Sequence, residues 1–162
     1  MNTSDQNVFT LDTAFKRRWN FEKISNIFND KEDEQYKRII PEFKNDEGEE
    51  IKWGVFQETI NNIINKELIN YGINGEDKQL GKYFVKDEEL KNKKKFAYKV
   101  LMYLWDDVVK VNRNILFDTE NYSTLDEVIE GFLNKNVGIK IFKDNFKSIM
   151  NYKKDEETKE QK

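Results

Sequence analysis

The sequence of 162 residues contains no cysteine, no histidine and a single proline. Without cysteine there can be no disulfide framework and no thiolate metal site. Without histidine, the usual zinc ligand and the most common general base are missing as well. A hydrolase with this composition would have to work through carboxylates, asparagine and arginine, and we expect no metal-binding residues in the chain.

Long apolar runs are also missing. No stretch approaches the roughly 20 apolar residues of a membrane span, and no signal-peptide hydrophobic region opens the chain, so we expect a cytoplasmic protein without a membrane partner. The net charge of −3 argues against a generally basic, nucleic-acid-binding surface. Hydrophobic residues make up 37% and aromatic residues 14% of the chain. This composition is too aromatic for a wholly disordered protein and predicts a core of aromatic, Ile and Leu side chains.

Three segments have apolar residues at the spacing of an amphipathic helix. The first is predicted over residues 53–72, with Gly72 as its stop, and the second from about Glu88 or Lys94 to Val111. The third begins near Thr124, which would form a capping box with Glu127. The apolar positions of the three segments are Trp53, Phe56, Ile60, Ile63, Ile64 and Leu68, then Phe96, Val100, Leu101, Leu104, Trp105 and Val108, and finally Leu125, Val128, Ile129, Phe132 and Leu133.

Two other segments are dominated by charge. Residues 29–50 are rich in Asp, Glu, Lys and Asn, and we interpret them as a surface insertion with one helical turn near Glu34–Ile40. Residues beyond Phe146 have the composition of a flexible tail. The run Lys91-Asn-Lys-Lys-Lys95 can contact nucleic-acid phosphates, but the acidic stretch that precedes it, residues 87–89, favours a solvated helix start.

The first twenty residues contain the candidate catalytic residues. Met1-Asn-Thr-Ser-Asp5 is a short polar stretch, and Leu11-Asp-Thr-Ala-Phe-Lys-Arg-Arg-Trp19 predicts a short helix that ends in Arg17 and Arg18. Arginine suits phosphoryl transfer because its planar guanidinium neutralises charge on the transferring oxygens. Each feature alone is common, since polar residues near a terminus are usually solvated and cations are favoured near a helix C-terminus. Their order along the chain is more informative.

In this order the residues resemble the McrB-type AAA+ nucleotidases of modified-cytosine-directed restriction systems. The hallmark of that family reads approximately Met-Asn-Thr-Ala-Asp-Arg, followed by Leu-Asp-x-Ala-(x)2-Arg-Arg-Phe-x-Phe, and residues 1–5, 11–14 and 17–21 follow it. Asp77-Lys-Gln-Leu-Gly-Lys-Tyr-Phe84 is similar to the lid segment of the family, which often reads Gln-Ile-Gly-His-Ser-Tyr-Phe. Tyr103-Leu-Trp-Asp-Asp107 fits the lid helix that follows.

The resemblance implies a role for each matching residue. Asn2 corresponds to the sensor-one asparagine, which orients the attacking water near the γ-phosphate. Asp5 corresponds to an acidic residue that supports this site or a neighbouring subunit's contact. Arg17 and Arg18 correspond to the pair that includes an arginine finger. Because such a finger reaches the nucleotide of a neighbour, the resemblance implies a ring of AAA+ subunits, often a hexamer.

In the lid segment, Gln79 and Gly81 are the implied nucleotide-binding residues. The sequence departs from the family pattern at Gln6, which replaces an arginine, and at Lys82, which stands where the lid has His-Ser. It contains no Gly-(x)4-Gly-Lys-Ser/Thr phosphate loop and no apolar strand that ends in Asp-Glu. We therefore expect the C-terminal part of a longer protein, which would bind GTP or ATP with Mg²⁺ only when intact. Whether the chain itself is an enzyme stays open.

The expected fold class is mainly α: the C-terminal end of an AAA+ α/β core, with one or two short strands and a helix, followed by a helical lid. The expected domains are the core remnant at 1–28, the insertion at 29–51, the lid at 52–145 and the tail at 146–162. The expected function is that of a fragment of an NTPase that powers a DNA restriction complex. Its partners would be other AAA+ subunits, a McrC-like nuclease and, indirectly, DNA. The alternative is a nonenzymatic helical interaction module from a truncated or split gene.

Overall fold

A computed structural model describes residues 18, 25–28, 30–31, 33–148 and 150 of the chain. Over these residues, α-, 3-10 and π-helices dominate, and the sheet has two antiparallel strands. The expectation of a mainly helical fold is therefore confirmed. The expected AAA+ core remnant, residues 1–28, lies mostly outside the described residues, and the described arrangement supports no AAA+ identification.

A helical turn and a hairpin precede the main helices. The turn expected near Glu34–Ile40 is present as α2 (Glu34–Lys37). The strands β1 (Ile39–Lys44) and β2 (Glu50–Lys52) then pair antiparallel. The charged composition of residues 29–50 predicts a surface insertion and does not reveal this hairpin. That interpretation is wrong for the apolar side chains of the hairpin, which are buried in the core: Ile40, Phe43 and Ile51.

An irregularity in β1 explains why the sequence did not reveal the strand. The pairing register shifts between Ile39 and Lys44, and Glu42 within this stretch has a φ of 53°. A bulge of this kind breaks the alternation of inward and outward side chains. Ile40 and Phe43 are consequently three positions apart although both are buried. The two-residue period that predicts a strand is lost.

The first predicted helix is confirmed as α3 (Trp53–Glu67), which continues into the 3-10 turn η1 (Leu68–Tyr71). Gly72 ends it in the left-handed conformation, with a φ of 70°, as predicted from its position. A second 3-10 turn, η2 (Gly75–Lys78), follows. The six apolar positions predicted for this helix are all buried: Trp53, Phe56, Ile60, Ile63, Ile64 and Leu68.

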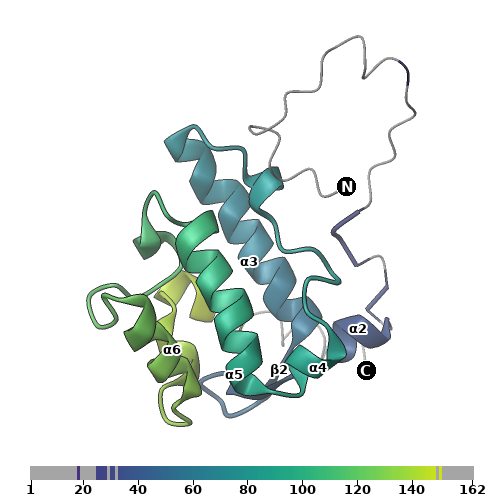
Figure 1. Ribbon diagram of the computed structural model, residues 1–162, viewed down its shortest axis with the longest axis vertical. Coiled ribbons are helices and arrows are strands. Elements are labelled where there is room, and N and C mark those ends of the chain that lie inside the picture. The colour runs from purple at the N-terminus through teal and green to yellow at the C-terminus, as the bar shows by residue number, and fades with distance from the viewer. Residues whose placement is uncertain (1–17, 19–24, 29, 32, 149, 151–162) are drawn as a thin grey trace.

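The second predicted helix is divided. α4 (Asp87–Leu90) is a single turn, and α5 (Lys93–Phe96) begins after a break. The helix then continues through two π-helical stretches, η3 (Ala97–Leu101) and η4 (Leu104–Val108), so it ends earlier than the expected Val111. All six of its predicted apolar positions are buried. Figure 1 shows this helix alongside α3, with which its Phe96 ring is in contact, and α6 on its other side.

The third predicted helix is α6 (Leu125–Leu133), and it begins with the expected capping box. The Thr124 Oγ1 accepts a hydrogen bond from the Glu127 backbone nitrogen at 3.2 Å. In return, the Glu127 carboxylate accepts one from the Thr124 nitrogen at 3.0 Å. Hydrogen bonds from Ser123 and Thr124 lower the pKa of the Glu127 carboxyl. The capping prediction is confirmed.

The chain remains packed beyond α6. The 3-10 turns η5 (Arg113–Ile115) and η6 (Gly138–Ile141) flank it in sequence, and residues 144–148 and 150 are helical. Phe146 and Met150 are 0% and 5% exposed. The expected flexible tail therefore does not begin at residue 146. The other domain boundaries stay predictions.

Aromatic rings form the centre of the core. The ring of Phe56 in α3 is surrounded by other aromatic rings, whose centroids lie about 6 Å from its own. These rings belong to α3 itself, the hairpin, α5 and the C-terminal segment. The ring partners of Phe56 are Phe43, Trp53, Phe96, Phe142 and Phe146. Phe142 and Phe146 stack at 4.3 Å between centroids. The predicted aromatic core is thus confirmed, and it joins segments that lie far apart in the sequence.

Candidate functional site

Residues 79–85, which overlap the lid-like segment Asp77–Phe84 singled out in the sequence, are held against α3 by side-chain amides. Asn61 contacts both backbone groups of Leu80: its Nδ2 donates to the Leu80 oxygen at 2.9 Å, and its Oδ1 accepts from the Leu80 nitrogen at 2.8 Å. Gln57 Nε2 donates to the same oxygen at 2.7 Å. Gln57 and Asn61 lie one turn apart on α3, and both are buried. They fix the position of Leu80 on the helix.

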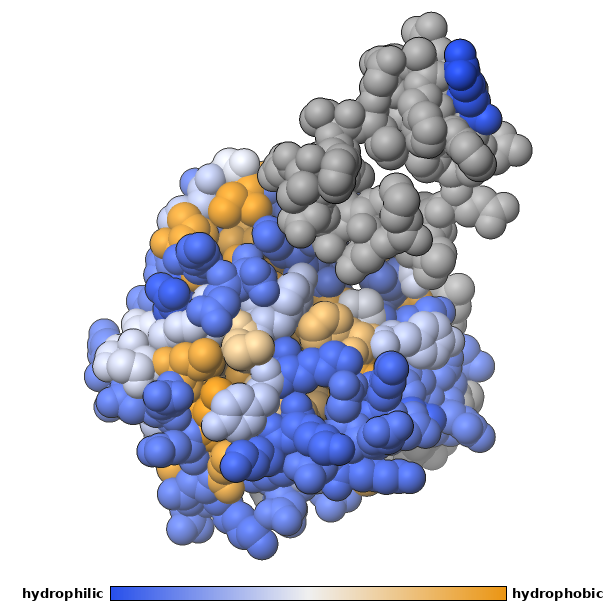
Figure 2. All heavy atoms as spheres, viewed as in Figure 1, coloured by the Kyte–Doolittle hydropathy of each residue, from blue (hydrophilic) through white to orange (hydrophobic). Residues whose placement is uncertain are grey.

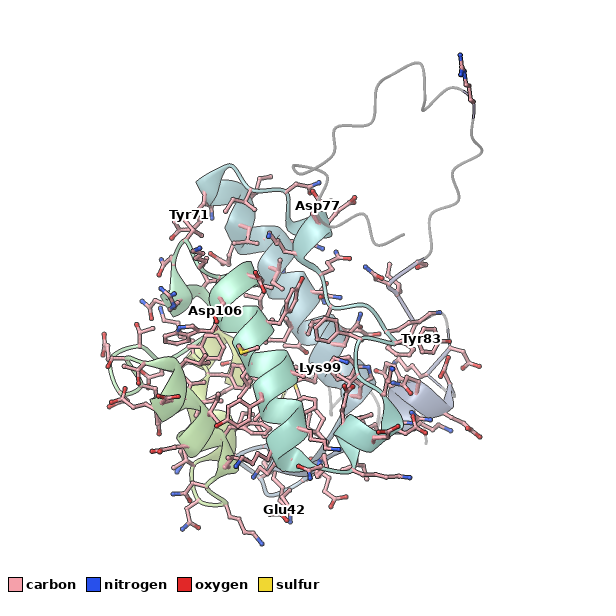
Figure 3. The ribbon with its side chains drawn as sticks, in the orientation of Figure 1. Glu42, Tyr71, Asp77, Tyr83, Lys99 and Asp106 are labelled. Carbon is pink, nitrogen blue, oxygen red and sulfur yellow. The ribbon has the colours of Figure 1, made fainter. Side chains whose placement is uncertain are left out.

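Two further buried side chains extend this attachment. Trp53 Nε1 donates to the Lys82 carbonyl oxygen at 2.8 Å, and Gln35 Nε2 donates to the Val85 oxygen at 2.9 Å. The backbone polar groups of an irregular segment must find such partners when they leave water. The result is an ordered segment that leaves the Tyr83 side chain 66% exposed, and Figure 3 shows Tyr83 at the edge of the molecule.

The two residues predicted to bind nucleotide, Gln79 and Gly81, belong to this segment. Gln79 Nε2 donates to Asn65 Oδ1 at 3.1 Å, and Gln79 Oε1 accepts from Asn26 Nδ2 at 3.5 Å. The Gly81 oxygen accepts from the Phe84 nitrogen at 2.9 Å. These contacts show that the Gln79 side chain helps to anchor the segment. A nucleotide contact at either residue remains untested.

The other predicted site residues lie at the start of the chain. Asn2, Asp5 and Arg17 are outside the described residues. Arg18 is described and is exposed. The catalytic roles assigned to these four residues therefore stay predictions, and no described contact connects Arg18 with the lid segment.

Replacing Asn61 by leucine is expected to lower the free energy of unfolding by about 2 kcal/mol. The substitution keeps the size of the side chain but leaves the buried Leu80 N–H without its acceptor, and an unsatisfied buried group costs about 1–3 kcal/mol. Urea unfolding of both proteins measures the difference. The matched control is Asn62→Leu at the next, exposed position, which should change stability by less than about 0.5 kcal/mol. Equal effects of the two substitutions would show that the Leu80 contact is unimportant.

A groove with a volume of about 730 Å³ lies on another part of the surface. It is bounded by the end of α3 with η1, by η5 and the loop that follows it, and by residues 142–147. Two of its lining residues, Ile115 and Phe142, are apolar, and both are almost fully buried. The remaining lining residues are polar or charged: Glu67, Tyr71, Asn112, Asn114, Asp118, Glu120, Asn121, Lys143, Asp144, Asn145 and Lys147.

Negative charge exceeds positive charge in this groove. Asp144 accepts a hydrogen bond from Lys147 Nζ at 2.8 Å. This hydrogen bond, with the positive charges of Lys147 and Lys143, lowers the pKa of the Asp144 carboxyl. The lining contains four carboxylates and two lysines, which leaves a net charge of −2 at neutral pH. The groove is suited to a cationic group.

Exposed apolar side chains lie close in sequence to residues that line the groove. Tyr71 lines it, is 43% exposed and accepts a hydrogen bond from Asn112 Nδ2 at 2.7 Å. Ile69 and Val111, close to these two residues in sequence, are 71% and 48% exposed. Figure 2 shows apolar side chains gathered over the C-terminal end of α3, and Figure 3 shows Tyr71 there. No sequence pattern predicted this surface; its one signal is that Ile69 lies outside the apolar stripe that predicted α3.

The residues that the structure describes contain neither a candidate metal-ion cluster nor a candidate membrane-spanning helix. No group of three or more acidic, histidine or cysteine side chains there is placed to hold a metal ion. None of the helices described is both long enough and apolar enough to cross a membrane.

Comparison with known proteins identifies the family. The model of a domain of unknown function, DUF927, matches residues 22–157, and the chain belongs to this family. The chain is also similar to the type II restriction enzyme BsuMI component YdiS of Bacillus subtilis (strain 168), with 41% identity over 137 residues. The similarity covers 82% of this chain and 36% of the relative, so the chain spans little more than a third of that protein. No solved structure matches the chain.

These findings overturn the resemblance to McrB-type AAA+ nucleotidases. The family match begins at residue 22, after the hallmark-like residues that made the resemblance specific. Those residues form short polar and basic patterns. In the later lid-like segment, the backbone is bound by side chains of α3, which gives these residues a structural role. The identification as an AAA+ fragment is therefore wrong. The expected ring, the McrC-like nuclease and the bound GTP or ATP with Mg²⁺ lose their basis with it, whereas the link to a restriction system is supported by the relative.

Proposed function

We propose that the chain is a protein-interaction domain of a restriction-system component and that it binds a partner subunit through the groove beside Tyr71. The relative from Bacillus subtilis is named as one component of a type II restriction enzyme. A protein that is one component of an enzyme needs surfaces that contact the others. Because this chain corresponds to only part of the relative, the proposal assigns it a contact and no catalytic step. Its cytoplasmic location stays a prediction.

The observation that supports the proposal is the coincidence of charge and apolar surface at one place. The groove has a net charge of −2 and is lined by the exposed Tyr71, and Ile69 and Val111 are exposed within two positions of lining residues. Tyrosine is among the residues that contribute most to binding at protein interfaces. Complementary charge, in turn, determines orientation and the rate of association more than it adds affinity. A surface with both features is suited to one defined partner segment.

The chemistry of the groove defines the segment that fits. A lysine or arginine side chain would lie near Glu67, Asp118 and Glu120. The fourth carboxylate of the lining, Asp144, is already ion-paired with Lys147. An apolar side chain next to it would cover Tyr71 and Ile69. The asparagine side chains of the lining can donate to and accept from a peptide backbone. The volume of about 730 Å³ is within the range of about 300–1,000 Å³ that is typical of binding pockets.

Peptides that cover the other components of the same restriction system test this proposal. Fluorescence anisotropy should identify a bound peptide that contains a lysine or arginine beside an apolar residue. Replacing that cation by glutamine should weaken binding. In this chain, Tyr71→Ala should raise the Kd at least tenfold, since truncation of an interface tyrosine costs about 2 kcal/mol.

The matched control is Tyr98→Ala. Tyr98 is 47% exposed, close to the 43% of Tyr71, but it does not line the groove. Its substitution should leave the Kd unchanged. If Tyr98→Ala weakens binding as much as Tyr71→Ala, or if the cation-free peptide binds as tightly as the original, the groove is not the binding site.

A further inference from the structure

A second charged surface, which is positive where the groove is negative, lies where α4 joins α5. Lys91, Lys94 and Lys95 are exposed there, and Lys93 is partly buried. Asn92 between them accepts a hydrogen bond from the Lys95 backbone nitrogen at 3.0 Å, which fixes the start of α5. Figure 2 shows that hydrophilic side chains cover this lower part of the visible face. We call Lys91, Lys93, Lys94 and Lys95 the α5 lysine cluster.

Two of the three acidic residues that precede the cluster, Asp87 and Glu89, are bound to other partners. Asp87 is ion-paired with Arg38. Glu89 accepts hydrogen bonds from Lys99 Nζ at 2.8 Å and from the Lys86 backbone nitrogen at 2.7 Å. Burial by itself would raise the pKa of the Glu89 carboxyl, but the contacts with Lys99 and Lys86 outweigh it and lower that pKa. Because these two carboxylates are paired with other cations, the exposed Glu88 is the acidic neighbour in this stretch that offsets part of the cluster's charge.

A fifth lysine joins the cluster from another part of the chain. Lys135, which follows α6, lies 3.3 Å from Glu42 Oε2, and Lys93 Nζ donates to the Glu42 carbonyl oxygen at 3.0 Å. Burial is the main cause of the lowered pKa of the Lys93 ammonium, and the positive charge of the nearby Lys135 acts in the same direction. The negative charge of Glu42 has the opposite effect on this pKa. Figure 3 shows Glu42 below the start of α5. Tertiary structure thus places lysines from α5 and from the loop after α6 around Glu42, whose carboxylate offsets one of their charges.

We infer that the α5 lysine cluster contacts the backbone phosphates of duplex DNA. Lysine is depleted in the centres of protein interfaces but is a common phosphate ligand, acting as a point charge. Membrane-surface binding would need an apolar face among the cations, whereas residues 91–95 are lysine and asparagine only. The choice of DNA rests on the restriction-system context of the proposed function, but the surface differs from the groove.

The contact would be independent of base sequence. Phosphate contacts position a protein on DNA, and base contacts specify the site. Since the whole chain has a net charge of −3, binding by the isolated chain should be weak and confined to low salt. The cluster would therefore serve to orient a larger restriction complex on its DNA.

Fluorescence anisotropy of the full chain with a short labelled DNA duplex, between about 50 and 200 mM salt, tests the inference. The test variant is Lys94→Gln with Lys95→Gln, and the control is Lys66→Gln with Lys110→Gln, two exposed lysines elsewhere. Both variants change the net charge equally. The test variant should raise the Kd about tenfold at the lowest salt and reduce the slope of log K against log salt by about 1.8, since each phosphate contact contributes about 0.9. The control should change neither quantity.

Three results would overturn the inference. The first is an equal loss of affinity in both variants, which would reflect net charge alone. The second is the absence of salt-dependent binding by the original chain at the lowest salt. The third is binding to vesicles of phosphatidylserine and phosphatidylcholine through the same lysines without binding to the duplex. Because Lys94 and Lys95 do not line the groove, failure here leaves the peptide-binding test of the proposed function unaffected.

Discussion

Replacing Phe56 by alanine should lower the free energy of unfolding by about 3–5 kcal/mol, the largest loss that we expect from a single substitution. Phe56 is 0% exposed, and its ring contacts Trp53 in the same helix and aromatic rings from three other parts of the chain: Phe43, Phe96 and the pair Phe142 and Phe146. Removing the ring loses its transfer free energy and leaves a cavity that the surrounding rings cannot fill without moving. A loss of this size is a large fraction of the stability of a typical domain.

Urea unfolding followed by circular dichroism measures this loss. The control is Tyr98→Ala, which removes an aromatic ring of similar size from a position that is 47% exposed. It should change the free energy of unfolding by less than about 0.5 kcal/mol. If Phe56→Ala costs no more than the control, the aromatic cluster is not the centre of the core.

Replacing Gly54 by alanine should destabilise the protein by about 3 kcal/mol, although the same change in an exposed helix would stabilise it by about 1 kcal/mol. Gly54 lies in the first turn of α3, directly against the ring of Tyr36 in α2. A Cβ at this position would overlap three atoms of that ring, including Cγ, which is close to the backbone and cannot swing away. Tyr36 is 2% exposed, so the ring has no free space to enter.

A double-mutant cycle distinguishes this overlap from a general intolerance of alanine. In a Tyr36→Ala background the obstructing ring is absent, and Gly54→Ala should then be neutral or stabilising because alanine favours the helix. The change of sign is the decisive measurement. If Gly54→Ala is equally harmful in both backgrounds, the contact with Tyr36 is not the cause.

Helix positions were predictable because their signal is local. The apolar stripes of α3, of the helix from α5 to η4 and of α6 repeat at helical spacing. The stop at Gly72 and the capping box of Thr124 and Glu127 depend on residues within a few positions of each helix end. Such signals need no knowledge of the rest of the chain, and the structure confirms them.

The candidate sites were much less predictable. Residues 77–84 were singled out by a resemblance that the family match contradicts. The contacts that hold residues 79–85 in place come instead from Asn61, Gln57 and Trp53 of α3. Polar residues on a helix do not by themselves indicate which distant backbone they bind. The short motif at the start of the chain was misleading for a related reason: a few common residue types in order can match a family hallmark by chance.

The sequence alone determined the helical class, the limits of the main helices within a few residues and an aromatic core, because these follow from composition and from spacing along the chain. Only tertiary structure decided the irregular hairpin at Glu42, the intolerance of a side chain at Gly54, the acidic groove beside Tyr71 and the gathering of Lys135 with Lys93. Each of these depends on residues far apart in sequence. Their side chains meet only after the aromatic core brings the helices and the hairpin together.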